Sequence, residues 1–293
     1  MKVVGIGGGH GLAASLRAAR RYASQVSAVV TVADDGGSSG RLSRELGVPP
    51  PGDIRNCLVA LARNDALAEL YQHRFESGSL TGHTFGNLMI AALTEMTGDF
   101  ARAVAEAGAL LEADGNVWPA TTDLVHMNAH VETGVIEGQV AVAQAREPIQ
   151  AVFLSPPDPS AYPAALDAII GADQVVLGPG SLFTSLIATL LVPGIRKAVQ
   201  ETKARRIFVC NTRMQKGETE GLDAAAHVGA LIAHAGPYSV DTIVVQHPVF
   251  PTDGVDTHEG LNFSGIEVVH ADIATQSGTH DPERLAAVLS QLA

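Results

Sequence analysis

The chain has few of the residues that build disulfide-stapled, zinc-binding or nucleic-acid-binding proteins. Its only two cysteines, Cys57 and Cys210, lie in apolar surroundings without a second ligand at zinc-site spacing, so we expect neither a disulfide nor a zinc site. Its 19 basic residues against 31 acidic ones give a net charge of −12, which repels a nucleic-acid backbone and an anionic membrane surface. Nucleic acid and membrane are therefore not expected partners.

We expect neither a secretory signal nor a membrane-spanning segment. The apolar residues after Lys2 are broken by glycines, so they do not form the helix of a signal peptide. The uncharged run from Gln174 to Ile195 is long enough to span a bilayer, but Gly178-Pro179-Gly180 interrupts it after a strand-sized piece. We expect a cytoplasmic protein in which this run is a buried strand followed by a helix.

What is present is the composition and pattern of a globular α/β protein. Apolar residues make up 46% of the chain and charged residues 17%, a balance that excludes intrinsic disorder. Apolar β-rich runs alternate with helical patterns at the start of the chain and again after Pro148, which predicts a Rossmann-like, doubly wound, mainly parallel sheet. The expected strands are residues 2–6, 25–32, 151–154, 174–177, 206–210 and 242–246, and the expected later helices are 161–170, 183–191, 194–202 and 223–235.

Between these two stretches the sequence predicts a helical insertion, over about residues 53–115, and a β-hairpin. Apolar residues three or four apart predict helices at 54–63, 66–75, 84–97 and 100–111. Residues 124–131 alternate between apolar and polar, and Thr133-Gly134 turns the chain into a second strand near 135–142. Because no linker or repeat separates the parts, we expect one Rossmann-like domain over residues 1–293.

A glycine-rich loop follows the first expected strand, at the sheet edge where doubly wound folds bind ligands. Its glycines let backbone N–H groups approach a phosphate, and a helix expected to begin near Leu12 adds positive potential. As a dinucleotide fingerprint, only the register Gly9-x-Gly11-x-x-Ala14 fits, and a tight packing turn is the alternative interpretation. The predicted ligand-binding residues here are Gly8, Gly9, His10, Gly11 and Leu12.

The second expected strand ends in residues 33–40, which have turn-forming composition throughout. Asp34 lies where a carboxylate can accept ribose hydroxyls, about 20 residues beyond the glycine loop. Asp34 and Asp35 together could instead hold Mg²⁺ between phosphates, or they could simply cap a polar turn. The predicted ligand-binding residues of this segment are Asp34, Asp35, Gly36, Ser38 and Ser39.

Polar residues at the starts of other helices complete the candidate site. Arg55 and Asn56 begin an otherwise apolar helix with Asp53 as its expected N-cap, and either ligand contact or a buried polar network would explain them. Ser181 lies at a strand-to-helix turn that suits a second phosphate or sugar, although an N-cap role explains it equally well. The candidates from these segments and from the loop at 211–219 are Arg55, Asn56, Asn87, Gly180, Ser181, Thr184, Asn211 and Gln215.

Six motifs are spread along the chain. They are VADDGGSSGR at 32–41, PGDIRN at 51–56, GNL at 86–88, TEMTGD at 94–99, LGPGSL at 177–182 and GET at 217–219. Together they resemble the YvcK-like family, whose members are called gluconeogenesis factors and which is related to the 2-phospho-lactate transferase of deazaflavin cofactor biosynthesis. The resemblance implies binding of UDP-sugars such as UDP-N-acetylglucosamine or UDP-glucose, with a role in carbon metabolism, cell shape and envelope synthesis. By this resemblance the nucleotide site uses Gly8, Gly9, Gly11, Leu12, Asp34, Asp35, Ser38, Ser39, Asn87, Gly180 and Ser181.

The chain departs from the family pattern at three places that concern sugar and base preference. His10 stands where the family usually has Thr, residues 213–216 read Arg-Met-Gln-Lys in place of Met-Thr-Gln-Pro, and the loop at 246–251 diverges. Three hypotheses for the function follow. The first is a UDP-sugar-binding regulatory protein that acts on a protein partner and forms a homo-oligomer. The second is a Mg²⁺-dependent transferase of a phosphorylated group, with Asp34 and Asp35 as metal ligands. The third is an NAD-linked enzyme, although no hydride-transfer partner is visible.

Overall fold

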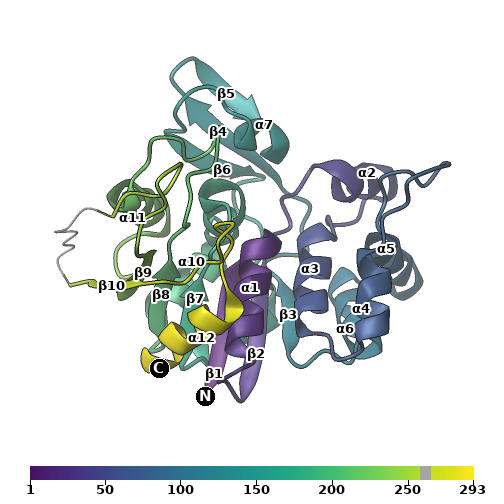
Figure 1. The fold of residues 1–293 in the computed structure, drawn as a ribbon. Coiled ribbons are helices and arrows are strands. Elements are labelled where there is room, and N and C mark those ends of the chain that lie inside the picture. The colour runs from purple at the N-terminus through teal and green to yellow at the C-terminus, as the bar shows by residue number, and fades with distance from the viewer. Residues whose placement is uncertain (258–264) are drawn as a thin grey trace.

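The computed structural model describes residues 1–257 and 265–293, which form two sheets and the helices around them (Figure 1). The larger sheet contains β1 (Lys2–Gly7), β2 (Gln25–Val30), β3 (Asn116–Pro119), β7 (Gln174–Leu177), β8 (Arg205–Val209), β9 (Thr242–Gln246) and β10 (Glu267–Ala271). All of its strand pairs are parallel. The smaller, antiparallel sheet contains β4 (His126–Val131), β5 (Gly134–Glu137) and β6 (Ala151–Ser155). The predicted α/β class and the β-hairpin are confirmed.

The strand order of the larger sheet reverses at β1. The order is β10-β9-β8-β7-β1-β2-β3, so the chain first builds outward from β1 through β2 to β3. It then returns to place β7 on the other side of β1 and continues outward to β10. Ligands of doubly wound sheets bind outside the carboxyl ends of the strands at such a reversal. We refer to the carboxyl ends of β1 and β7, with the loops that follow them, as the β1/β7 edge.

Helices pack on the sheet and fill the long connection between β2 and β3. That connection contains α2 (Gly37–Leu46), α3 (Gly52–Leu61), α4 (Asp65–Gln72), α5 (Phe85–Thr97) and α6 (Phe100–Leu110), on the right in Figure 1. Figure 1 also shows α1 (Gly9–Ala19) and α12 (Pro282–Gln291) side by side in front of the strands, and α1 contacts both α3 and α12. The other helices are α7 (Gln139–Ala143), α8 (Pro163–Ile170), the π-helix η1 (Leu182–Ile187), α9 (Ala188–Leu190), α10 (Pro193–Glu201) and α11 (Ala224–Ala235).

Three predicted boundaries are wrong in ways that affect the site. The segment 33–40 is not turn throughout, because α2 begins at Gly37 and buries the small side chains of Ser38 and Ser39. The second hairpin strand stops at Glu137, because Gly138, with a φ of 94°, redirects the chain into α7. The helix expected near Leu12 begins at Gly9, so the glycine loop itself forms the first turn of α1.

In the parts of the chain that the structure describes, no single helix is long and apolar enough to cross a membrane. One pair, Leu182–Leu190 with Pro193–Glu201, would be so only if taken together, and the two pieces meet at 80°. Every residue of Leu182–Leu190 is buried within the protein. The uncharged run from Gln174 is thus the buried strand and helix that the sequence predicts.

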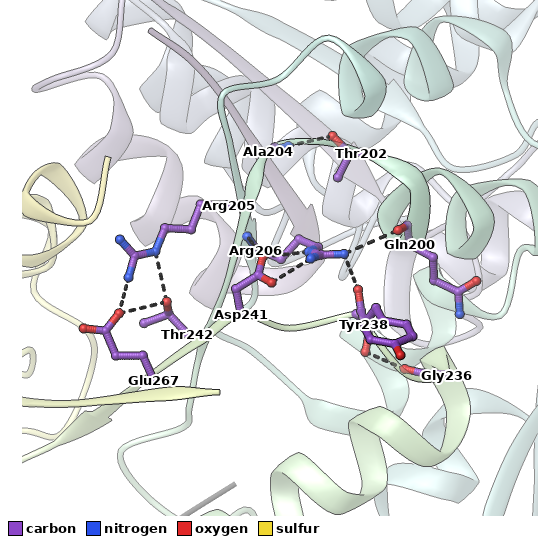
Figure 2. A network of polar contacts seen from close by, with 11 residues as sticks. Gln200, Thr202, Ala204, Arg205, Arg206, Gly236, Tyr238, Asp241, Thr242 and Glu267 are labelled. Atoms are coloured by element: carbon purple, nitrogen blue, oxygen red, sulfur yellow. Dashed lines mark hydrogen bonds and ion pairs between the residues drawn. The ribbon is translucent and has the colours of Figure 1, made fainter. Parts of the chain in front are cut away.

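Ion pairs link the amino ends of three strands, on the side of the sheet opposite the β1/β7 edge (Figure 2). Arg206 at the start of β8 donates to both carboxylate oxygens of Asp241, from Nε at 2.7 Å and from Nη2 at 2.6 Å. Burial acts to raise the pKa of Asp241, but the bonds and charge of Arg206 outweigh it and hold that pKa below its ordinary value. The neighbouring Arg205 joins Thr242 of β9 to Glu267 of β10. These charges therefore tie β8, β9 and β10 together at their amino ends.

Candidate functional site

The loops that follow β1 and β7 are in backbone contact. A Cβ on Gly11 would lie 2.4 Å from the carbonyl oxygen of Pro179 and 2.8 Å from the Cα of Gly180. A Cβ on Gly180 would lie 3.1 Å from the carbonyl oxygen of Gly8. Real Cβ atoms do not approach backbone at 2.4 Å, so Gly11 is required for this contact. The structure therefore brings the two predicted glycine loops together at the β1/β7 edge.

The first turn of α1 presents backbone N–H groups at this edge. Gly8 is the N-cap and has no side chain to satisfy them, and His10 is exposed. The side chain of Leu12 is fully buried, and its N–H points back to the Gly8 carbonyl oxygen at 3.4 Å. A first turn whose N-cap residue has no side chain, at the positive end of the helix dipole, is suited to an anionic group.

Asp53 is the site residue that the sequence prediction misplaces. Pro51 is the N-cap of α3, and Asp53 lies inside its first turn. Its carboxylate accepts a hydrogen bond from the Gly9 N–H, and a Cβ on Gly8 would lie 2.3 Å from its Oδ2. Loss of hydration raises the pKa of Asp53 to about 7, and repulsion from Asp34 adds to the effect. A carboxyl that titrates near neutral pH against a phosphate-type loop is a candidate acid or base.

Asp34 lies close enough to Asp53 for its charge to raise the pKa of Asp53. Its Oδ1 accepts a hydrogen bond from the Gly36 N–H at 2.9 Å, and its Oδ2 would be 3.2 Å from a Cβ on Gly52. Burial raises the pKa of Asp34, although the bonds from Gly36 and Ser39 oppose the shift. Among the residues that the structure describes, no three His, Cys, Asp or Glu side chains are grouped as metal ligands. The Mg²⁺ site at Asp34 and Asp35 stays a prediction.

The Asp35 carboxylate, unlike that of Asp34, is bound by α7. Its Oδ2 accepts from the Gln139 N–H at 3.0 Å and its Oδ1 from the Val140 N–H at 2.9 Å. The other end of α7 lies against the loop after β8, since a Cβ on Gly217 would be 2.9 Å from the Ala143 carbonyl oxygen. The helix α7 thus connects the loops after β2 and β8, which flank the β1/β7 edge on either side (Figure 1).

We expect Asp35→Ala to loosen α7 without unfolding the larger sheet. The substitution removes two charge-assisted hydrogen bonds from the start of α7, which is worth about 1–2 kcal/mol of stability for a cap of this kind. Hydrogen exchange should therefore accelerate in residues 138–145 and stay unchanged in β1 and β7. Equal exchange in the variant and the unmodified protein at residues 138–145 would contradict this role of Asp35.

A buried polar network connects α2, α3 and α5. Arg55 is only 6% exposed, and it donates from Nη1 to Thr84 Oγ1 at 2.5 Å and to Asn87 Oδ1 at 3.2 Å. Its Nη2 donates to Asn56 Oδ1 at 2.8 Å. Asn87 in turn lies 3.5 Å from the hydroxyl of Ser39. The structure thus brings together four predicted residues, Ser39, Arg55, Asn56 and Asn87, in a buried polar network, which is one of the two explanations that the sequence left open for Arg55 and Asn56.

A second set of predicted residues surrounds the loop after β7. The Gly180 N–H donates to Asn211 Oδ1 at 3.3 Å, and Asn211 Nδ2 donates to Gln215 Oε1 at 3.2 Å. Gln215 Nε2 donates to the hydroxyl of Ser181 at 3.0 Å. Ser181 occupies the N-cap position of η1, but its side chain makes no capping bond. The loops after β7 and β8 therefore form one polar rim of the site.

Glu218 is a site residue that the sequence analysis leaves out of the candidates. It is 6% exposed, and its Oε1 accepts from the N–H groups of Phe183 at 2.8 Å and Thr184 at 2.9 Å. The Thr184 hydroxyl also donates to this carboxylate at 3.3 Å. Burial raises the pKa of Glu218, and these hydrogen bonds oppose the shift. Glu218 therefore holds the start of η1 in place, and its position in the GET motif at 217–219 is the signal by which it could have been found.

Two of the three divergent segments contact each other. The guanidinium of Arg213 lies 4.3 Å from the ring centroid of Phe250, and its Nη1 donates to the Thr252 carbonyl oxygen at 2.7 Å. The residues that depart from the family pattern at 213–216, in the loop after β8, therefore lie next to those at 246–251.

The fold and the site define an α/β protein whose glycine loops meet at the reversal of a parallel sheet. The chain matches the sequence model of the family described as 2-phospho-L-lactate transferase CofD over residues 3–284, and it belongs to this CofD family. It is 41% identical over 309 residues to the gluconeogenesis factor of Bacillus subtilis, covering 99% of this chain and 98% of that one. It is 46% identical over 247 residues to the gluconeogenesis factor of Halalkalibacterium halodurans, covering 83% of this chain and 77% of that one. A crystal structure of a UPF0052 family member from Bacillus halodurans superposes with a TM-score of 0.94 at 39% identity, covering 98% of both chains. The resemblance to gluconeogenesis factors is confirmed.

Proposed function

We propose that the protein is a regulatory protein that binds a UDP-sugar, such as UDP-N-acetylglucosamine or UDP-glucose, at the β1/β7 edge. The observation that carries this proposal is the backbone contact of Gly11 with Pro179 and Gly180, which places two glycine loops together at the first turn of α1. That arrangement suits a diphosphate, because N–H groups and the helix dipole supply the positive potential. Ligand occupancy would then control a protein partner or the assembly of a homo-oligomer in the cytoplasm.

The net charge of −12 does not argue against such a ligand. The field at the site comes from groups within a few ångströms, and surface charges farther than a Debye length of about 8 Å are screened at physiological salt. The polar rim of Asn211, Gln215 and Ser181 supplies amide and hydroxyl groups for the sugar hydroxyls. The relatives' name, gluconeogenesis factor, supports a role in carbon metabolism.

Thermal unfolding in the presence of candidate ligands tests the proposal. UDP-N-acetylglucosamine, UDP-glucose, GDP and NAD should each be added with and without Mg²⁺. At a hundredfold excess over Kd, a ligand that binds only the folded state stabilises it by about 2.7 kcal/mol, or roughly 5–10 °C in Tm. We expect a shift with a UDP-sugar, and a shift with none of them would contradict the proposal. A shift with NAD alone would favour the NAD-linked alternative.

The second candidate function is a Mg²⁺-dependent transferase of a phosphorylated group. The carboxyls of Asp34 and Asp53, both with raised pKa values beside the glycine loop, favour it, as does the family's description. Hard carboxylate oxygens at this place fit a Mg²⁺ ion, with Asp34 as a ligand and Asp53 beside it, whereas the Asp35 carboxylate accepts from α7. The ion would neutralise charge between phosphates, while Gly9 and Gly11 hold the leaving nucleotide. Asp34→Asn should then abolish any Mg²⁺-dependent release of nucleotide, and unchanged release would contradict the metal role.

A further inference from the structure

Glu218 buries a negative charge where a neutral side chain could make the same contacts with the backbone. The N–H groups of Phe183 and Thr184 both donate to one oxygen of Glu218, Oε1. The amide oxygen of a glutamine could accept both bonds without the cost of removing a charge from water. Burial raises the pKa of Glu218, and the groups that oppose the shift are hydrogen-bond donors. No ion pair of Glu218 occurs among the described residues, so the charge needs a reason other than holding η1.

The carboxylate differs from an amide in that both of its oxygens accept hydrogen bonds and neither donates. The Thr184 hydroxyl lies 3.3 Å from each of the two oxygens. A hydrogen bond from the Ser181 hydroxyl is another of the contacts that oppose the raised pKa of Glu218. Because an ionised carboxylate has no proton to give, Ser181 is the donor in this bond. The Ser181 oxygen can therefore only accept hydrogen bonds from its other neighbours.

Three further hydrogen bonds run from Gly180 to Ser181, and all of them point the same way. The Gly180 N–H donates to Asn211 Oδ1 at 3.3 Å. Asn211 Nδ2 donates to Gln215 Oε1 at 3.2 Å, and Gln215 Nε2 donates to Ser181 Oγ at 3.0 Å. We call this series, which ends at Glu218, the rim chain. A backbone N–H only donates and a carboxylate only accepts, so the two ends fix the orientation of both side-chain amides between them.

The direction of the rim chain decides which hydrogen-bonding groups are left for a ligand. Asn211 and Gln215 each have a second amide proton that the rim chain does not use, and the Ser181 oxygen has one unused lone pair. All three residues are partly exposed. The rim therefore offers two hydrogen-bond donors and one acceptor.

We propose that Glu218 is a positioning residue that sets the direction of the rim chain, so that Asn211 and Gln215 donate to the ligand and Ser181 accepts from it. The matching ligand group is a sugar that places acceptor oxygens against the two amides and a hydroxyl proton against Ser181. The recognition of a sugar here rests on the proposed function, whereas the direction of the rim chain does not.

Glu218→Gln tests this role, because it keeps an acceptor oxygen for Phe183 and Thr184 but replaces the other oxygen with an NH₂ donor. That donor turns the Ser181 proton outward, toward the ligand. We expect calorimetry to show a UDP-sugar bound about tenfold more weakly, as for the loss of one hydrogen bond. The urea midpoint should not fall, since the variant no longer buries a charge. Glu220→Gln is the matched control, because Glu220 is exposed and its loss changes the net charge equally.

The side-chain amide signals of Asn211 and Gln215 in ¹⁵N NMR spectra test the direction without any ligand. Loss of the anion at the end of a series of hydrogen bonds weakens the bonds that precede it. Both signals should therefore shift in Glu218→Gln and stay in place in Glu220→Gln. Gln200 provides the internal reference, because its Nε2 donates to the Ala235 carbonyl oxygen and not to the rim.

Ser181→Ala breaks the rim chain without touching the backbone contacts of Glu218. Ser181 is partly exposed and its side chain makes no capping bond to η1, so this variant should fold normally. We expect it to shift the Gln215 amide signal and to weaken UDP-sugar binding about as much as Glu218→Gln does.

Unchanged amide signals of Asn211 and Gln215 in Glu218→Gln would overturn the proposal. So would a UDP-sugar that binds Glu218→Gln and the unmodified protein with equal affinity. If the signals shift but no UDP-sugar binds either protein, the proposed function fails and the direction of the rim chain stands.

Discussion

Replacement of Gly11 by alanine should push apart the loops after β1 and β7 and abolish ligand binding at the β1/β7 edge. The added Cβ would lie 2.4 Å from the Pro179 carbonyl oxygen, 2.6 Å from the Pro179 carbonyl carbon and 2.8 Å from the Gly180 Cα. These are backbone atoms, so no side-chain rotation relieves the contact. We expect a loss of about 3 kcal/mol in the free energy of unfolding, measured by urea denaturation, together with loss of the ligand-induced shift in Tm.

Gly229→Ala provides the matched control. Gly229 lies within α11, and a Cβ there would have no heavy atom within 4 Å. Alanine in a helix interior stabilises by about 1 kcal/mol relative to glycine, so this variant should be slightly more stable and bind ligand normally. A Gly11→Ala protein with the stability of the unmodified protein would show that the two loops do not touch as described.

The sequence predicts the sheet well where strands are buried on both faces and poorly where they are not. β1 and β7 are short apolar runs bounded by glycine, so their pattern is visible without knowledge of their neighbours. β10 is partly exposed along most of its length at the edge of the sheet, and β3 has four residues and ends in a proline. Neither contains the continuous apolar run that predicts a parallel strand.

The residues of the candidate site also differ in how well the sequence predicts them, because some roles depend on nearby residues and others on residues far away in the chain. Glycine loops at strand ends are local signals, and the structure places those at Gly11 and Gly180 in contact. The roles of Asp53 and Glu218 depend on partners far away in the sequence, respectively Gly9 and the start of η1. Local reasoning assigns a carboxylate near a helix start to capping, which is the commonest role for such a residue. Only the tertiary structure reveals that Asp53 binds the first turn of a different helix.

Asp53→Asn should stabilise the protein at pH 8 and have little effect near pH 4. The pKa of Asp53 is raised from 3.8 to about 7, so between these values the unfolded chain releases a proton that the folded protein retains. Stability therefore falls as pH rises through this window and levels off above it. The asparagine removes this loss, and its amide oxygen can still accept the hydrogen bond from Gly9. We expect a gain of about 2–4 kcal/mol in the free energy of unfolding at pH 8, from denaturant titrations between pH 4 and 8.

Asp158→Asn controls for the change in net charge, because Asp158 is exposed in the segment between β6 and α8. If the stability gain of Asp53→Asn is the same at pH 4 and pH 8, the carboxyl does not titrate in the folded protein as described. The pH dependence of ligand affinity is a second measurement, which separates stability from function. A bound phosphate at the first turn of α1 would lie beside the Asp53 carboxylate, so repulsion should weaken binding as that group ionises above pH 7. In Asp53→Asn this decline disappears, and ligand affinity should stay constant between pH 6 and pH 8 once the titration of the ligand itself is subtracted.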